Sequence, residues 1–332
     1  MREVPGNADL ARVRRDVRVG RSVAGVSRGR LKYAQLRTIH RSMNAKVVLL
    51  CGGQGTRMRE ETEFRPKPMV EVGGRPLLWH IMKSYAHHGF DEFVLCLGYR
   101  GQMIKRYFLD YHLLNADVTF DLRSGGVRYG DRGHAEGWTV TCADTGDRSM
   151  TGARVKRIEQ HLGDADLVLV TYGDGLCDID LRALVAFHRS HGRLATVTGV
   201  HAPARFGQLV ADGRWVRQFA EKPTETGWIN GGFFVFERAV FDRLSADPGC
   251  VLEHEPLERL AADGQLAVYH HEGYWQCADT VRDVELLRGL WDADAAPWRV
   301  WDDRAAGEGR NAGRRAADFA ASPEAALRRS AA

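Results

Sequence analysis

The sequence predicts an α/β fold with a mostly parallel central sheet. Short apolar runs rich in β-branched residues alternate with segments whose apolar residues recur at helical spacing, a pattern typical of parallel strands covered by helices. The chain has 332 residues, of which 44% are hydrophobic and 27% charged, so it is long enough to bury a sizeable core. No run approaches the roughly 18 uninterrupted apolar residues of a membrane-spanning helix. We therefore expect a globular cytoplasmic protein with no membrane partner.

The first half of the chain alternates strands and helices. Lys46 to Leu50 reads as a buried first strand, and the apolar runs 93–97 and 167–172 have the same character. Between these strands, apolar residues at helical spacing predict a helix from Leu78 to Gly89, where the glycine is suited to a C-cap. A second helix is expected from Gln102 to Leu114.

The second half contains more strand-like segments and fewer helices. We predict strands at 195–200, 206–210, 215–219 and 231–236, and a helix at 255–262. This change indicates a nucleotide-binding half followed by a more mixed half that holds a second substrate.

The two ends differ in composition from the middle of the chain. Residues 1–45 hold ten arginines and one lysine against three acidic residues, so the net charge of +4 arises there. We interpret 1–42 as a basic extension, disordered or upstream of a true start at Met43, 43–301 as the functional domain and 302–332 as an Ala/Arg-rich tail. The extension has no recognisable fold to present its arginines, so we expect no nucleic-acid partner. Nucleic-acid binding by this arm stays an alternative.

Cysteine and histidine patterns exclude several kinds of site. The six cysteines contain no CxxC pair and the 13 histidines no HExxH motif, so the sequence predicts reduced thiols without a zinc site or disulfide framework. A GxSxG motif is also missing, which argues against a serine hydrolase.

A glycine-rich loop follows the first strand. In Cys51 to Arg57, three glycines in four positions let backbone N–H groups approach phosphate or base edges, and the Arg57 guanidinium can bind a phosphate. The loop matches neither GxxxxGK[ST] nor GxGxxG. Further on, Lys67 stands between Pro66 and Pro68, which fix the backbone around its ammonium. Together the two segments predict a binding site for a polyphosphate.

These two segments resemble the sugar-nucleotidyltransferases, and the resemblance continues in the family's order over essentially all of 46–301. It is carried by the blocks GGQGTRM, RPKPMVEVGGRPLLWHIM, GYRGQMIKRYF, ADVTFDL, DTGDRSMTGARVKRI, TYGDGLCDID, RFGQL, EKP, INGGFFVF, EPL and GYWQCADTVRD. The blocks DTGDRSMTG, NGGFFVF and WQCADT resemble the branch of the family that transfers a cytidylyl group.

The resemblance implies a Rossmann-like fold of the nucleotide-diphospho-sugar transferase type, with a mostly parallel sheet and a mixed sugar-binding half. It also implies transfer of a cytidylyl group from CTP to α-D-glucose 1-phosphate, with release of pyrophosphate. Such a reaction positions two polyanions and neutralises their charge, with Mg²⁺ held by carboxylates. Asp174, in a Tyr-Gly-Asp-Gly turn after the strand 167–172, is well placed to hold the ion, and the resemblance makes Asp279 its second ligand. An aspartate that only caps a turn or helix is the alternative for each.

The resemblance also assigns the remaining site residues. The catalytic set is Arg57, Lys67, Asp174 and Lys222. Nucleotide contacts are expected from Leu50, Cys51, Gly52, Gly53, Gln54, Gly55, Thr56, Arg57, Lys67, Ser149, Arg154 and Gly173. The sugar phosphate is expected at Gly207, Glu221, Lys222 and Asn230, with Lys222 paired with the phosphate. Members of the family are commonly homo-oligomers, which we also expect here.

Some positions depart from the family's pattern. Cys51 stands where alanine is usual, Gln54 where leucine is commoner, and Arg65 and Arg100 replace lysines. Residues 123–136 resemble the family poorly and are expected to form a mobile loop or a subunit contact. Two alternatives stay open: a sister enzyme that uses another nucleoside triphosphate or sugar 1-phosphate, and a non-catalytic regulatory subunit that binds a sugar nucleotide.

Overall fold

The computed structural model describes residues 44–130, 136–201, 208–212, 214–220 and 227–301. The predicted basic extension 1–42 and tail 302–332 lie outside the described residues, as do Gly207, Glu221 and Lys222. Within the described ranges, no helix has both the length and the apolar character needed to cross a membrane.

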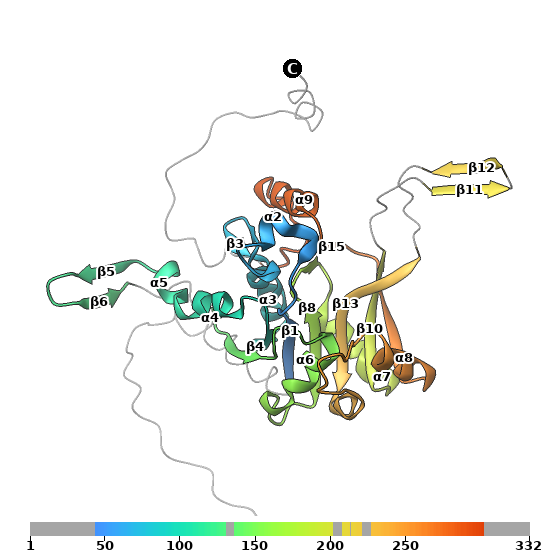
Figure 1. Cartoon of the computed structure of the whole chain (residues 1–332), viewed down its shortest axis with the longest axis horizontal. Helices are drawn as coiled ribbons and strands as arrows, with labels where there is room; N and C mark the ends of the chain where they lie inside the picture. The colour runs from blue at the N-terminus through green and yellow to red at the C-terminus, as the bar shows by residue number, and fades with distance from the viewer. Residues whose placement is uncertain (1–43, 131–135, 202–207, 213, 221–226, 302–332) are drawn as a thin grey trace, which may run out of the picture. The chain divides into compact units, whose positions relative to one another are not determined.

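A seven-stranded sheet forms the centre of the described chain (Figure 1). Its strands, in spatial order, are β14 (Leu266–His271), β10 (Ala195–His201), β13 (Trp228–Glu237), β8 (Leu167–Tyr172), β1 (Ala45–Leu50), β4 (Glu92–Leu97) and β7 (Thr139–Asp144). Only β13 runs antiparallel to its two neighbours, which confirms the mostly parallel sheet. The central strands β1 and β8 are buried along most of their length, as expected of parallel strands covered on both faces.

Helices and short hairpins follow the strands along the chain. The α-helices are α2 (Arg59–Thr62), α3 (Leu77–His87), α4 (Gly101–Leu109), α5 (Tyr111–Asn115), α6 (Thr151–Arg157), α7 (Leu181–His191), α8 (Glu255–Ala262) and α9 (Val281–Asp292). Short 3₁₀ helices span Thr56–Met58, Lys67–Met69, Glu159–His161 and Arg238–Arg243. Paired minor strands are β2 (Glu71–Val72) with β3 (Arg75–Pro76), β5 (Val118–Asp121) with β6 (Gly126–Tyr129), β9 (Gly175–Cys177) with β15 (Trp275–Cys277), and β11 (Gln208–Asp212) with β12 (Trp215–Ala220).

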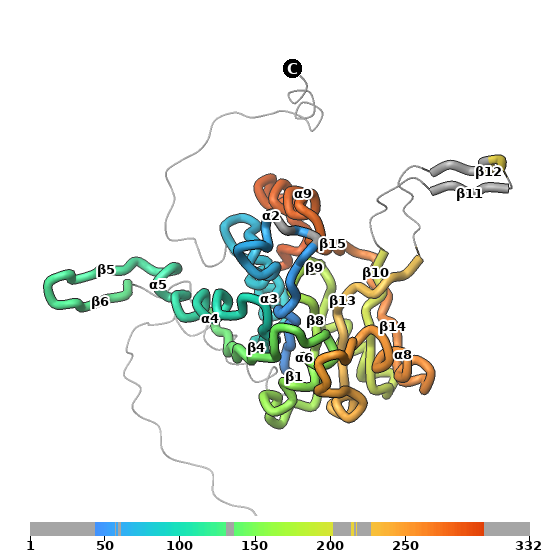
Figure 2. Tube along the Cα trace, viewed as in Figure 1, coloured from blue at the N-terminus to red at the C-terminus, as the bar shows by residue number. Residues whose placement is uncertain are grey.

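Segments far apart in the sequence meet on one side of the sheet. Figure 2 shows α9, coloured red, beside the early helix α2, coloured blue. An ion pair joins them, with Arg288 Nη2 3.1 Å from Glu61 Oε1. This contact brings the residues that precede α9, including Asp279, close to the segment that follows β1.

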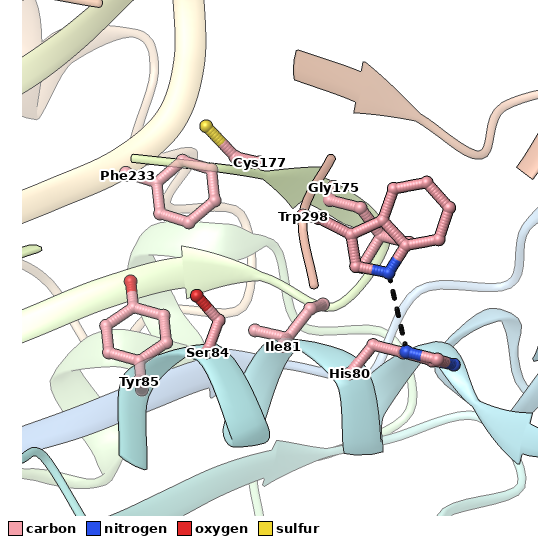
Figure 3. A pocket seen from close by; sticks show the side chains of 9 residues that line it. His80, Ile81, Ser84, Tyr85, Gly175, Cys177, Phe233 and Trp298 are labelled. Carbon is pink, nitrogen blue, oxygen red and sulfur yellow. Dashed lines mark hydrogen bonds between the residues drawn. The ribbon is translucent and has the colours of Figure 1, made fainter. Parts of the chain in front are cut away.

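The interior beside α3 is closely packed. The space between α3, β9 and Trp298 is a void of about 10 Å³ (Figure 3), which is too small for a ligand. Trp298 Nε1 donates to His80 Nδ1 at 3.4 Å, and His80 Nε2 lies 2.9 Å from the Val72 carbonyl oxygen. Burial lowers the pKa of His80 to about 4. The imidazole is therefore neutral at physiological pH, with Nε2 as the donor.

One expectation for the first half was wrong. The predicted helix 102–114 is divided at Asp110 into α4 and α5. The break lets Tyr111 accept a hydrogen bond from Trp79 Nε1 at 3.2 Å, and aspartate is a weak helix former in an interior position. In the stretch 123–136, which was expected to form a mobile loop or a subunit contact, residues 126–129 pair as a strand with β5, and residues 131–135 lie outside the described residues. Asp121 accepts hydrogen bonds from the backbone of residues 123 and 124 and so fixes this turn.

Candidate functional site

The site lies where the central strands end. At the carboxyl ends of β1 and β8, a cavity of about 280 Å³ opens between their following loops, the start of α6 and the 3₁₀ helix Lys67–Met69. Its lining residues are Leu50, Cys51, Gly52, Gly53, Gly55, Lys67, Pro68, Ser149, Met150, Thr151, Arg154, Tyr172, Gly173 and Asp174. Ligands of open parallel sheets bind at this edge because the loops after adjacent strands face one another there.

The side chain of Arg154 holds the glycine loop, residues 51–57, in place. This side chain is buried, and its guanidinium donates to the carbonyl oxygens of Leu97 and Gly52, each at 3.0 Å, and to Thr145 Oγ1 at 2.8 Å. A Cβ on Gly52 would lie 2.1 Å from Arg154 Nη1, so only glycine lets the loop pass this close. Burial lowers the pKa of Arg154. The arginine thus shapes the loop as well as lining the cavity.

The turn after β8 passes equally close to β1. The Gly173 N–H donates to the Leu50 carbonyl oxygen at 3.2 Å. A Cβ on Gly173 would lie 2.7 Å from Pro68 Cγ and 3.0 Å from that carbonyl oxygen. The absence of a side chain at Gly173 therefore lets Asp174 project toward Lys67.

Two carboxylates share the ammonium of Lys67, which lines the cavity together with Asp174. Lys67 Nζ lies 2.5 Å from Asp174 Oδ2 and 2.7 Å from Asp279 Oδ1. Burial alone lowers the pKa of Lys67, but the Asp174 and Asp279 carboxylates outweigh it and the pKa is raised. The ammonium is therefore charged at neutral pH.

Backbone pairing holds the two aspartates together. β9 and β15 pair antiparallel with Gly175 opposite Cys277, and the Ala278 N–H donates to the Asp174 carbonyl oxygen at 2.9 Å. Thr280 then caps α9 in a capping box with Asp283. The aspartate pair is thus fixed by a strand pair on one side and a helix start on the other.

The aspartate pair also suits a divalent cation. Asp174, Asp279 and Cys277 place their ligand atoms within 4.8 Å of one another. Burial raises the pKa of the Cys277 thiol, which keeps it protonated and leaves two carboxylates as the donors. Such an oxygen donor set fits Mg²⁺, which prefers one or two carboxylates together with water and phosphate oxygens. That these carboxylates already hold one cation, the ammonium of Lys67, supports the fit.

The structure brings most of the predicted nucleotide residues together. Leu50, Cys51, Gly52, Gly53, Gly55, Lys67, Ser149, Arg154, Gly173 and Asp174 line the cavity. Gln54 and Thr56 are exposed and are not among its lining residues. Ser149 Oγ accepts from Arg157 Nη1 at 2.9 Å. Arg57 is the middle residue of the 3₁₀ helix Thr56–Met58, and its side chain lies outside the described part of the structure.

Sequence reasoning missed a second polar group beside the cavity. Tyr172 and Thr151 line the cavity, and both donate hydrogen bonds to the Glu253 carboxylate, Thr151 at 2.5 Å. Asn230 Nδ2 in turn donates to the Tyr172 hydroxyl at 3.3 Å. Tyr172 could have been noticed as the first residue of the Tyr-Gly-Asp-Gly turn. Glu253 gave no signal, because a single glutamate before a helix is an ordinary surface pattern.

One group of side chains brings a histidine and a cysteine together although no motif spacing indicates it. Cys177, Asp178 and His271 bring their ligand atoms within 4.8 Å of one another. Motif spacing missed it because β14 is distant from β9 in the sequence. His271 Nε2 lies 3.0 Å from Asp178 Oδ1, and burial raises the pKa of the Cys177 thiol. The contact fastens the end of β14 to the segment after β9.

Comparison with known proteins identifies relatives over the same region. The sequence profile of the family described as nucleotidyl transferase matches residues 46–295. The chain is 47% identical over 258 residues to glucose-1-phosphate cytidylyltransferase of Salmonella typhi, covering 77% of this chain and 100% of that protein. It is 43% identical over 256 residues to a probable glucose-1-phosphate cytidylyltransferase of Bacillus subtilis strain 168, with the same coverage. A mannose-1-phosphate guanylyltransferase catalytic subunit beta of Dictyostelium discoideum is 29% identical, covering 74% and 64%.

Solved structures share the architecture at lower identity. A putative glucose-1-phosphate thymidylyltransferase from Bacillus anthracis, in complex with a sucrose, matches with a TM-score of 0.54 and 19% identity, covering 74% of this chain and 94% of that chain. HddC from Yersinia pseudotuberculosis matches with a TM-score of 0.54 and 21% identity, covering 74% and 99%. These similarities confirm the α/β fold.

Proposed function

This chain belongs to the nucleotidyl transferase family, and we propose that it transfers a cytidylyl group from CTP to glucose 1-phosphate, giving CDP-glucose and pyrophosphate. The observation that carries the proposal is the grouping of Lys67, Asp174 and Asp279 at the mouth of a cavity floored by a glycine loop. Two relatives, 47% and 43% identical, align with this chain over their full length. The first is named glucose-1-phosphate cytidylyltransferase and the second a probable glucose-1-phosphate cytidylyltransferase.

The reaction requires positioning and charge neutralisation more than covalent catalysis. A phosphate oxygen of glucose 1-phosphate forms a bond to the α-phosphorus of CTP, and the bond from that phosphorus to the bridging oxygen breaks, which releases pyrophosphate. The glycine loop presents backbone N–H groups to the nucleotide, and the Lys67 ammonium supplies positive charge to the phosphates. A side chain at Gly52 or Gly173 would collide with Arg154 or Pro68, so glycine is required at both positions for this arrangement.

We further propose Mg²⁺ as the cofactor, with Asp174 and Asp279 as its protein ligands. When bound, the ion would neutralise phosphate charge as the pyrophosphate leaves. The two carboxylates are each less than one quarter exposed, at 22% and 17%. This partial burial strengthens their attraction for a cation relative to a fully hydrated pair.

The sugar phosphate is proposed to bind on the side of β13. Asn230 lies at the start of this strand and is exposed, so its amide is available to a hexose hydroxyl. Gly207, Glu221 and Lys222 complete the proposed site, with Lys222 paired with the phosphate of the sugar and Glu221 with its hydroxyls.

We also propose that the chain acts as a homo-oligomer in the cytoplasm. Leu109 and Leu114, near the ends of α4 and α5, are 82% and 67% exposed, and Leu122 in the β5–β6 hairpin is 94% exposed. A second copy of the chain would cover this apolar surface.

The state of the cysteines supports the proposed cytoplasmic location. All six cysteines are free, as in proteins kept in a reducing compartment.

The proposal is tested by pyrophosphate release with Mg²⁺ and glucose 1-phosphate, offering CTP, UTP, dTTP, GTP and ATP in separate reactions. A clear preference for CTP supports it. Activity with a different nucleotide keeps the reaction class but overturns the product. If the folded protein releases no pyrophosphate with any of the five nucleoside triphosphates, another sugar phosphate as substrate or the non-catalytic alternative is favoured.

A further inference from the structure

A carboxylate that the mechanism does not use lies behind the wall of the cavity. Glu253, in the segment before α8, is half-buried and accepts from Thr151 Oγ1 at 2.5 Å through Oε2. Its other oxygen, Oε1, accepts from the Tyr172 hydroxyl. Both donors line the nucleotide cavity, whereas Glu253 itself is not among the lining residues. The carboxylate therefore acts on the cavity only through these two hydroxyl groups.

Chemistry fixes the direction of each hydrogen bond in this group. An ionised carboxylate only accepts, so the Tyr172 hydroxyl must donate its single hydrogen to Glu253. Burial and the Glu253 charge both raise the pKa of Tyr172, so the phenol keeps that hydrogen at neutral pH. The phenol oxygen is left as an acceptor, and it faces Asn230 Nδ2 at 3.3 Å.

The same chain of hydrogen bonds fixes the amide of Asn230. With Nδ2 directed at Tyr172, the carbonyl oxygen Oδ1 accepts from the Gly232 N–H at 2.8 Å. A flipped amide would place its NH₂ group next to the Gly232 N–H, so that two donors would face each other. It would also place its carbonyl oxygen next to the Tyr172 hydroxyl, whose hydrogen is already donated to Glu253. One N–H of Nδ2 and one lone pair of Oδ1 are left to face a ligand. The exposed amide therefore has a defined donor side and a defined acceptor side.

We propose that Glu253 is a positioning residue for the sugar phosphate, which acts through Tyr172 to orient the Asn230 amide toward a hexose hydroxyl. The inference rests on the proposed function and adds a residue that does not touch either substrate. Because Tyr172 lines the nucleotide cavity and Asn230 lies on β13, the relay also joins the nucleotide half of the site to the sugar half. A hydrogen-bond relay of this kind determines affinity for the sugar more than affinity for the nucleotide.

The test compares Glu253→Gln and Tyr172→Phe with the wild-type protein in steady-state assays that vary each substrate separately. In Glu253→Gln an amide replaces one acceptor, so Tyr172 or Thr151 loses its acceptor. Tyr172→Phe keeps the ring and removes only the hydroxyl. We expect the KM for glucose 1-phosphate to rise about tenfold in either variant, the loss of one oriented hydrogen bond, with the KM for CTP changed less than twofold. The double variant should be no worse than either single one, because both break the same relay.

Glu258→Gln is the matched control, since Glu258 is exposed on α8, and it should leave both KM values unchanged. An unchanged KM for glucose 1-phosphate in both relay variants, with an active wild type, overturns the inference and leaves the proposed function standing. A joint fall of thermal stability, kcat and affinity for both substrates also overturns it, because this would show a structural role only. A folded wild-type protein that releases no pyrophosphate with glucose 1-phosphate overturns the proposed function, and the inference with it.

Discussion

The ammonium of Lys67 lies 2.5 Å from Oδ2 of Asp174, although 107 positions separate the two residues in the chain. The contact joins the segment after β1 to the turn after β8, and a third residue, Asp279, completes it at 2.7 Å. The ammonium of Lys67 thus contacts the same pair of carboxylates that is proposed to hold Mg²⁺.

Asp174→Asn should lower turnover by at least about 10²-fold, because removing one charged contact in a preorganised site costs this much or more. The fold should persist, since Asn is isosteric and the backbone bond from Ala278 to the Asp174 carbonyl oxygen is unaffected. Pyrophosphate release and thermal melting measure the two effects. Asp242→Asn, at an exposed position, serves as the control. Turnover within twofold of wild type would remove Asp174 from the proposed metal site.

Lys67→Met should bind a divalent cation more tightly in the absence of nucleotide, because the ammonium no longer competes for Asp174 and Asp279. Titration with Mn²⁺ followed by electron paramagnetic resonance measures this affinity directly, without reference to activity. Turnover should fall at the same time, since the phosphates lose a positive charge. Equal Mn²⁺ affinity in the variant and the wild type would contradict the idea that the lysine and the ion share one pair of ligands.

Local patterns were enough to predict the strands that carry the site. The runs 46–50 and 167–172 are mostly apolar on both faces, a signal that does not depend on distant residues. The structure places β1 and β8 there with differences of one residue or less. The helix 255–262 was predicted with the bounds of α8. The spacing of apolar residues does not indicate the break between α4 and α5, which accompanies a contact of Tyr111 with Trp79, 32 positions away.

Only part of the site could be predicted, because some of its contacts join residues that are distant in the chain. Glycine loops and a lysine between prolines are visible as motifs, because their chemistry depends on neighbours in the sequence. Glu253 depends instead on Tyr172 and Thr151, 81 and 102 positions away. Arg154 was expected to contact the nucleotide, and its hydrogen bonds to Leu97 and Gly52 give it a supporting role that no motif reveals.

Gly52→Ala should destabilise the protein by about 1–3 kcal/mol, the usual cost of overpacking a well-packed site. The added Cβ would lie 2.1 Å from Arg154 Nη1, so the guanidinium must give up hydrogen bonds in a buried position. Urea denaturation measures the free energy of unfolding. Gly289→Ala is the control, because a Cβ there meets nothing within 4 Å and alanine favours a helix interior. Equal stability of Gly52→Ala and wild type would show that the loop can move away from Arg154 freely.

The stability of the protein should fall as the pH drops from about 6.5 toward 4, and His80 should account for part of this fall. Burial lowers its pKa from 6.5 to about 4, so the unfolded state binds a proton in this window that the folded state does not. The contribution of His80 to stability is therefore fully present above its pKa in the unfolded state. Below that pKa it declines by roughly 1.4 kcal/mol for each pH unit, or about 3 kcal/mol in total.

His80→Gln removes the titrating group and should make the decline in stability between pH 6.5 and 4 less steep. His112→Gln, at an exposed position, is the control and should leave the slope of stability against pH unchanged. Urea unfolding at several pH values measures the slope, and identical slopes for His80→Gln and wild type would mean that burial does not hold His80 neutral in the folded protein.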